Sequence, residues 1–366
     1  MTTRQQRAAG ALWGLAVGDA LGMPTQSTQR ADIVDRYGEM LGGLEPGPPD
    51  QPLAPGLPAG HVTDDTEQAA IVARRLIEDD GHIDPHHLAA DLIDWQEQMR
   101  QRGSLDLLGP STNAALEQLR AGVSADETGR AGTTNGAAMR IAPVGVAVPP
   151  EPLSGLVDAV HEASFVTHNT SIALSGAAAV AAAVSAGIET GDMGEATHAA
   201  IAAAQLGAGL GHWVAAADIA TRIEFVARAA GADFGPTPQR AAGPFGTLAA
   251  DDAVPRPMPL AAVFALAGNL IGTSVQTAES VPAAFVFTLA IRDPWVAVRA
   301  AASCGGDTDT VAAMAGAIIG AVHGPDVFPA EARAAIVQAN PGLNVDGYVA
   351  PLLALRDRAA QDGGAR

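Results

Sequence analysis

Glycine recurs at every fourth residue near the start of the chain, at positions 10, 14, 18 and 22. A four-residue step keeps these positions on one face of a helix, where another backbone can come close. The segment 8–22 is otherwise apolar except for Asp19. We therefore predict a tightly packed helix here. Within it, Asp19 is expected either to be a buried hydrogen-bonding hub or to lie near a functional site.

The rest of the chain favours helices that pack closely through small side chains. Of the 366 residues, 48% are hydrophobic, only 4% are aromatic, and alanine is abundant. Apolar residues recur at helical spacing and no alternating strand pattern stands out. We predict an all-α fold, a compact orthogonal helical bundle that forms one domain over residues 1–366, with a fraying polar tail at 356–366. The expected helices include 66–79, 84–101, 111–121, 154–166, 169–187, 196–206, 260–271, 278–291, 294–303 and 311–322.

Two long segments are too rich in proline to be helices or central strands. Residues 45–60 carry six prolines and end just before an acidic cluster, and residues 231–259 are rich in glycine and proline. Because long loops in compact domains are often functional, we expect 45–60 to be a rim or lid, or else a plain surface excursion.

The overall charge excludes some partners. A formal net charge of −19 argues against nonspecific nucleic-acid binding, which requires a basic surface. The N-terminal residues do not read as a signal peptide, and the apolar stretches 172–187 and 311–322 fall short of membrane-spanning length. We expect a cytoplasmic protein without a membrane partner, and favour a monomer. The single cysteine, Cys304, is expected to be a small buried residue beside a turn, with a catalytic thiol as the alternative.

Two acidic clusters are the strongest indication of chemistry: Thr63-Asp64-Asp65-Thr66 and Asp307-Thr308-Asp309-Thr310. Each precedes an apolar run with helical spacing, so each resembles a helix N-terminus. Asp and Thr are ordinary helix caps, which is the alternative interpretation. Capping requires one or two such groups, however, and crowded like charges favour a bound cation. Four carboxylates balance two divalent ions, and oxygen-only clusters suit Mg²⁺ or Mn²⁺.

Five motifs together resemble the ADP-ribosylglycohydrolase family, which includes dinitrogenase reductase-activating glycohydrolase. They occur in the family's usual order and cover most of the chain: GLAVGDALGMP (14–24), VTDDTEQA (62–69), TNGAAMRIAPVG (134–145), VTHNT (166–170) and GGDTDTVAAMAGAIIGA (305–321). The resemblance implies an all-α domain with a binuclear Mg²⁺ or Mn²⁺ cleft. It also implies hydrolysis of a glycosidic bond to ADP-ribose on a protein or small-molecule acceptor.

The resemblance also implies roles for individual residues. One metal would be held by Thr63, Asp64 and Asp65, and the other by Asp307, Asp309 and Thr310, with Asp309 bridging. Asp64 and Asp65 are the candidates for positioning the water or the leaving group. The substrate would contact His168 and a turn that cradles the diphosphate and ribose, formed by Gly132, Thr133, Thr134, Asn135 and Gly136. On its own, that segment could be a mere turn and His168 a cap or surface residue.

Gln26 departs from the family pattern, which commonly has glutamate at this position. A glutamine cannot deliver or accept a catalytic proton, although its oxygen could bind a metal. Three hypotheses follow. The chain is a metal-dependent ADP-ribosyl hydrolase, an ADP-ribose-binding or structural relative with altered catalysis, or a hydrolase of nucleosides or nucleotides that leaves the diphosphate turn unused.

Overall fold

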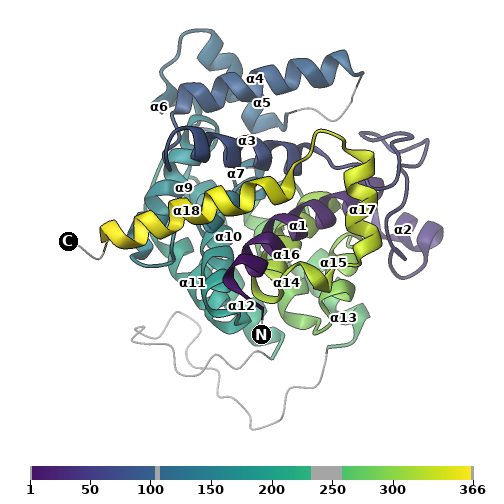
Figure 1. Ribbon diagram of the computed structural model, residues 1–366. Coiled ribbons are helices and arrows are strands. Elements are labelled where there is room, and N and C mark those ends of the chain that lie inside the picture. Colours follow the sequence, from purple (N-terminus) through teal and green to yellow (C-terminus); the bar gives the residue numbers. More distant parts are fainter. Residues whose placement is uncertain (1, 104–107, 232–257, 364–366) are drawn as a thin grey trace.

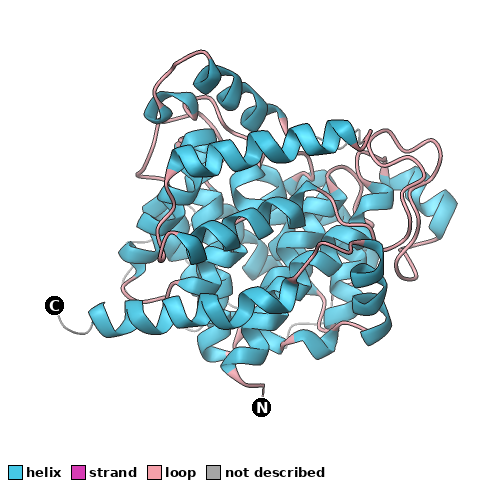
Figure 2. Ribbon diagram, turned by 45° about the horizontal axis from the view of Figure 1, so that its top comes forward, coloured by secondary structure: helices cyan, strands magenta, loops and turns pink. Residues whose placement is uncertain are grey.

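The computed structural model describes residues 2–103, 108–231 and 258–363 (Figure 1). Within these ranges the chain is helical, and its only β-type contacts are three isolated bridges (Figure 2). The all-α prediction is confirmed for the described part of the chain. The helices are α1 (Arg4–Gly22), η1 (Met23–Thr25), α2 (Arg30–Tyr37), α3 (Asp64–Glu78), α4 (Pro85–Gln101), α5 (Pro110–Arg120), α6 (Ala125–Thr128), α7 (Gly136–Met139), α8 (Ala142–Ala147), α9 (Leu153–His168), α10 (Ser171–Thr190), α11 (Met193–Gly207), α12 (Ile219–Ala229), α13 (Leu260–Ala265), the π-helix η2 (Leu266–Ile271), α14 (Thr277–Ala290), α15 (Pro294–Ala301), α16 (Thr308–His323), η3 (Pro325–Val327), α17 (Ala330–Ala339) and α18 (Val345–Gly363).

Helices α1 and α16 pack backbone to backbone along the glycine face of α1. A methyl group on Gly14 would overlap the carbonyl oxygen of Gly316, and one on Gly18 would overlap that of Ala312. At the end of α1, a methyl group on Gly22 would collide with the backbone of Asp309. The predicted close approach of a second backbone is therefore confirmed. It brings the end of α1 against the start of α16.

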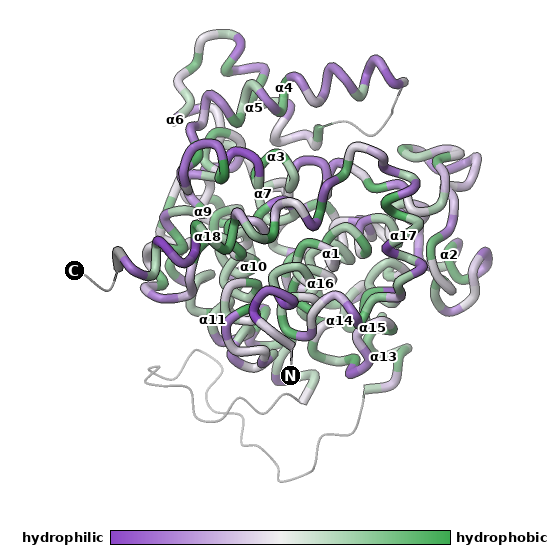
Figure 3. Tube along the Cα trace, viewed as in Figure 1, coloured by the Kyte–Doolittle hydropathy of each residue, from purple (hydrophilic) through white to green (hydrophobic). Residues whose placement is uncertain are grey.

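Helix α10 forms the centre of the core beside this pair. Its residues from Ser171 to Ile188 are all buried, and the buried hydrophobic residues of the described chain form one contiguous cluster. By length and composition α10 could cross a membrane, contrary to our prediction that its apolar stretch is too short, but neighbouring helices bury that apolar stretch completely. That environment is typical of a core helix. Figure 3 shows hydrophobic residues along α10, α14 and α16, and hydrophilic residues along α4 at the top.

Most of the expected helices are present, with ends shifted by a few residues. The longer helices α2, α12, α17 and α18 and the short helices α6, α7 and α8 were not predicted. Helix α18 continues to Gly363, whereas we expected fraying from residue 356. The reason lies at Arg356, which is buried and donates hydrogen bonds to the carbonyls of Val148 and Ser185. Residues 45–60 contain no helix or strand, as predicted, whereas 232–257 lie outside the described residues.

We predict that Gly316→Ala lowers the free energy of unfolding by about 2–3 kcal/mol, because a backbone carbonyl of α1 occupies the space of the new methyl group. Gly155→Ala in α9 is the matched control. Its nearest neighbour would be Pro152 Cγ at 3.8 Å, so alanine should stabilise that helix by about 0.5–1 kcal/mol. Urea denaturation measures both, and equal effects would contradict close α1–α16 packing as the constraint.

Candidate functional site

The two acidic clusters meet where α3 and α16 begin. The hydroxyl of Thr310 donates a hydrogen bond of 3.2 Å to Asp65 Oδ2, a contact between residues 245 positions apart. Asp65 and Asp309 are buried, while Asp64 and Asp307 are partly exposed. The clusters therefore form one site, in which Asp64 and Asp307 lie nearer the solvent.

Helix capping accounts for only part of these residues. Thr63 is the N-cap of α3, and its hydroxyl accepts a hydrogen bond from the backbone N–H of Asp65. Asp307 occupies the equivalent position before α16, yet its side chain caps nothing there. It instead accepts a hydrogen bond of 2.6 Å from the side-chain amide of Asn135. The capping interpretation is thus correct for Thr63 and wrong for Asp307.

The buried carboxylates repel one another. Burial raises the pKa of Asp65 well above its ordinary value, and the charges of Asp309, Asp64, Asp19 and Asp307 raise it further. Oδ1 of Asp65 is buried and no described residue donates a hydrogen bond to it. A buried acceptor of this kind, surrounded by other carboxylates, lacks both a donor and a counter-charge.

Asp19 is the hydrogen-bonding hub that holds the start of α3. It is fully buried and accepts hydrogen bonds from the backbone N–H groups of Thr63 and Thr66 and from the Thr66 hydroxyl. Burial raises its pKa to about 6, against the opposing effect of these hydrogen bonds. Asp19 is therefore both a buried hydrogen-bonding hub and a residue near the candidate site, because it holds the start of α3, where the first acidic cluster lies.

The segment from Gly132 to Gly136 reaches the same site. Asn135 bonds Asp307 on one side and Ser280 Oγ on the other. Thr134 Oγ1 lies 3.1 Å from Nε2 of His168, which is fully buried rather than on the surface. Burial, followed by the charge of Arg140, lowers the pKa of His168 well below its ordinary value, so its ring is neutral.

Gln26 lies beside the turn that leads into the second cluster. Ser27 N–H donates to the carbonyl of Gly306, and Gln51, from the proline-rich segment 45–60, donates to the carbonyl of Gln26. The Gln26 side chain is 3% exposed, and its Oε1 has no donor among the described residues. The segment 45–60 therefore contributes a buried residue next to the site instead of being a plain surface excursion.

The residues present fit hard divalent cations by donor type, with four carboxylates and the hydroxyls of Thr63 and Thr310. The buried Oδ1 of Asp65 is an acceptor that such an ion would satisfy. In the described ranges, no group of three His, Cys, Asp or Glu side chains is arranged as a ready metal cage. Binding would accordingly draw the carboxylates closer together, and threonine hydroxyls or water would complete the shells.

Sequence reasoning missed a buried polar network behind the site. Arg140 is fully buried and donates hydrogen bonds to Gln68 and Thr167. The available signal was an arginine inside the apolar run AAMRIAPVG. The prediction of a small buried residue is confirmed for Cys304, because burial raises the pKa of its thiol and disfavours a nucleophilic thiolate.

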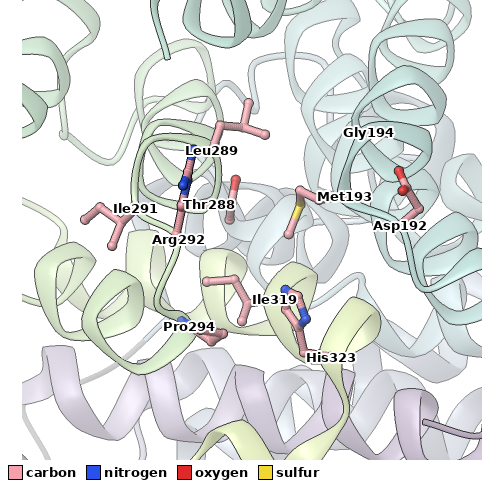
Figure 4. Close-up of a pocket in the computed structure, with 10 residues that line it drawn as sticks. All are labelled: Asp192, Met193, Gly194, Thr288, Leu289, Ile291, Arg292, Pro294, Ile319 and His323. Atoms are coloured by element: carbon pink, nitrogen blue, oxygen red, sulfur yellow. The ribbon is translucent and has the colours of Figure 1, made fainter. Parts of the chain in front are cut away.

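A cavity of about 410 Å³ lies elsewhere, between the start of α11, the end of α14 and the end of α16 (Figure 4). Its lining includes Asp192, Arg292 and His323, and none of the predicted site residues. Since the acidic clusters lie at the opposite end of α16, this cavity is separate from the candidate site.

The sequence profile of a protein family described as ADP-ribosylglycohydrolase matches residues 1–362. An uncharacterized protein of Escherichia coli (strain K12), YegU, is 30% identical over 357 residues, covering 97% of this chain and 98% of its own length. The ADP-ribosyl-[dinitrogen reductase] glycohydrolase of Rhodospirillum rubrum is 29% identical over 170 residues, 44% of this chain and 51% of its own. A solved structure described as an ADP-ribosylglycohydrolase-related protein complex has the same fold, with a TM-score of 0.66, 23% identity and coverage of 97% of this chain and 99% of that one.

We predict that Thr66→Val lowers the free energy of unfolding by about 1.5–3 kcal/mol, because it removes a hydrogen bond to the buried Asp19 carboxylate. Thr288→Val is the matched control, since this buried hydroxyl donates only to the carbonyl of Phe285 in its own helix. We expect the control to change stability by less than about 1 kcal/mol. Thermal and urea unfolding measure both, and a Thr66→Val protein as stable as the wild type would contradict the role of Asp19 as the hub.

Proposed function

The chain belongs to the ADP-ribosylglycohydrolase family, and on that premise we propose that it is a metal-dependent hydrolase. It would release ADP-ribose, or a related ribosyl group, from a protein side chain or a small-molecule acceptor. The observation that carries the proposal is the direct contact between the two acidic clusters, the hydrogen bond from Thr310 to Asp65. It joins the two clusters at Asp65, a buried carboxylate whose Oδ1 accepts no hydrogen bond from the described residues.

The proposed ligands of two Mg²⁺ or Mn²⁺ ions are Thr63, Asp64 and Asp65 from the first cluster and Asp307, Asp309 and Thr310 from the second. When bound, such ions supply Lewis-acid chemistry and positive charge among the carboxylates. The proposal is supported by the pKa of Asp65, which burial raises and the surrounding carboxylates raise further. It is also supported by the side chain of Asp307, which does not cap the helix that it precedes.

The remaining roles fall to the protein's own groups. Glycosidic cleavage passes through a positively charged oxocarbenium-like state, which the carboxylates would stabilise. Asp64 and Asp65 would orient the attacking water and accept its proton. Asp64 suits a role at the substrate side, because it is partly exposed while the buried amide of Gln68 donates to its Oδ2.

The turn at 132–136 would bind the diphosphate and ribose through fewer groups than the motif alone suggests. The N–H groups of Gly132, Thr134 and Asn135 are already bonded to Gly129, Ser111 and Val275. Among these five residues, Thr133 and Gly136 are left to donate backbone hydrogen bonds to an anion. The Asn135 side chain would keep Asp307 in place beneath the bound sugar.

Gln26 supports a second candidate function, an ADP-ribose-binding relative without turnover. Its buried Oε1 can accept a hydrogen bond or ligate a metal, but the amide cannot move a proton. The internally bonded N–H groups of the turn support the third, hydrolysis of plain nucleosides or nucleotides. Competition between ADP-ribose and simple ribosides, run beside a turnover assay in Mg²⁺ and in Mn²⁺, separates these functions from the first.

We predict that Asp309→Asn reduces release of ADP-ribose from arginine- or serine-linked substrates by about 10²-fold or more, because it removes a charge that stabilises the cationic transition state. EDTA should have the same effect on the wild type, and Mg²⁺ or Mn²⁺ should restore its activity. Asp35→Asn, on an exposed carboxylate of α2, is the control and should retain full activity.

A second readout of the same variants does not depend on turnover. Mg²⁺ or Mn²⁺ should raise the melting temperature of the wild type and of Asp35→Asn, but not that of Asp309→Asn. Retained, EDTA-resistant activity in Asp309→Asn would refute the metal-dependent mechanism. Metal-induced stabilisation without any turnover would favour the binding function.

We predict that Gln26→Glu increases the rate of hydrolysis by about tenfold or more, because a carboxylate beside the second cluster can transfer a proton, a step typically worth 10²–10⁴-fold. Gln26→Ala controls for the loss of the amide, and the assay is initial-rate release of ADP-ribose at saturating metal. A Gln26→Glu rate equal to that of the wild type would show that position 26 does not limit turnover.

A further inference from the structure

Arg140 is a buried cation for which stability alone gives little reason. It is fully buried between α7 and α8, and burial lowers its pKa to about 10, while the charge of Asp64 acts in the opposite direction. Its Nε is buried without an acceptor among the described residues. A hydrophobic side chain of similar volume is often as stable or more stable at such a position, so a specific role is the more economical explanation.

One arm of Arg140 leads to the first acidic cluster. Nη1 donates a hydrogen bond of 3.0 Å to Gln68 Oε1, and Gln68 Nε2 donates one of 2.7 Å to Asp64 Oδ2. A guanidinium only donates and a carboxylate only accepts, so the Gln68 amide has a single orientation that satisfies both. Arg140 thereby fixes the amide that holds Asp64.

The other arm leads to the turn at 132–136. Nη2 donates a hydrogen bond of 2.6 Å to Thr167 Oγ1. The hydroxyl proton of Thr167 can serve either the carbonyl of Ser164, at 3.3 Å, or Nδ1 of His168, at 2.8 Å. We assign it to Ser164, so that Thr167 accepts from both Arg140 and His168, and the ring proton of His168 is then on Nδ1.

The tautomer of His168 then determines what Thr134 can do. With its proton on Nδ1, His168 presents a lone pair at Nε2, which lies 3.1 Å from Thr134 Oγ1. The Thr134 hydroxyl must donate inward to this nitrogen. Its oxygen therefore offers only lone pairs to anything bound outside the turn, and it can accept a hydrogen bond from a substrate hydroxyl but cannot donate one.

We propose that Arg140 is a positioning residue: through Thr167 and His168 it orients Thr134 as an acceptor for a substrate hydroxyl, and through Gln68 it holds Asp64. These contacts form one continuous path through buried side chains that joins the first acidic cluster to the turn. The path runs Asp64–Gln68–Arg140–Thr167–His168–Thr134. This inference rests on the proposed function only for the identity of the substrate, a ribosyl group whose hydroxyls would donate to Thr134.

The test is the tautomer of His168, which a merely structural role of Arg140 would not change. Nitrogen-15 NMR of histidine-labelled protein distinguishes the two neutral forms, and loss of the signal in His168→Gln assigns it. We expect the wild type to show one form with the proton on Nδ1. In Arg140→Met, Thr167 loses its obligatory donor, so we expect a mixture of forms and a fall in kcat/KM of about tenfold or more.

Arg356→Met is the matched control. Arg356 is also a buried arginine, but it bonds carbonyls around α8 and α10 and does not contact the site. This variant should lose stability while keeping the His168 signal and kcat/KM of the wild type. Arg140→Lys keeps the charge without the fork that reaches both Gln68 and Thr167. Arg140→Lys should therefore show a mixture of His168 forms. A single form with the proton on Nδ1 in this variant would contradict the proposed role of Arg140.

An unchanged His168 signal together with kcat/KM within about twofold of the wild type in Arg140→Met would refute the proposal. If Arg140→Met does not fold, Thr167→Val provides the same test, because it breaks the path at equal side-chain size. Its His168 spectrum and kcat/KM must change as described, or the proposal fails. A wild type that hydrolyses no ribosyl substrate would refute the proposed function alone, since the NMR measurement needs no turnover.

Discussion

The backbone contact between α1 and α16 determines how the two acidic clusters of the candidate site meet. Gly14 and Gly316 allow the two helices to touch without intervening side chains, and Gly22 leaves room for the backbone of Asp309. Because the contact continues to the last turn of α1, the start of α16 is held against the turn that carries Asp19, and Asp19 in turn holds the start of α3. A side chain at any of these glycines would push one acidic cluster away from the other.

The close packing of α1 and α16 keeps together carboxylates that repel one another. Asp65 and Asp309 are both buried, and the pKa of Asp65 is raised first by this burial and then by the charge of Asp309. The protein offsets the repulsion with donors at the edges of the cluster: Thr310 to Asp65 and Asn135 to Asp307. Neither donor carries a positive charge, so the arrangement favours an added cation more strongly than a cluster already paired with lysine or arginine would.

Features that depend on neighbouring residues could be predicted from the sequence, whereas contacts between distant segments could not. The glycine repeat, the helical spacing after Thr66 and the caps at the acidic clusters are local patterns, and the helices they predicted are present. The burial of Arg356 and the contacts of Arg140 depend on segments distant in sequence, and no local pattern encodes them. Asp307 illustrates the limit of local patterns. Its position in the sequence is that of a helix cap, but in the structure its side chain bonds to Asn135, which lies far away in the sequence.

The residue at position 26 affects both the repulsion among the carboxylates and the proton transfer of the proposed reaction. A glutamate there would place another carboxylate beside a cluster of four, and it would increase the repulsion in the absence of cations. The glutamine removes that charge but retains a buried oxygen, Oε1, without a donor among the described residues. Glutamine at position 26 therefore lowers the repulsion in the metal-free protein, but at the same position it removes a group that could transfer a proton. In such a site, proton transfer must rest on the aspartates, and their orientation, held by Gln68 and Asp19, becomes the property that the surrounding structure has to preserve.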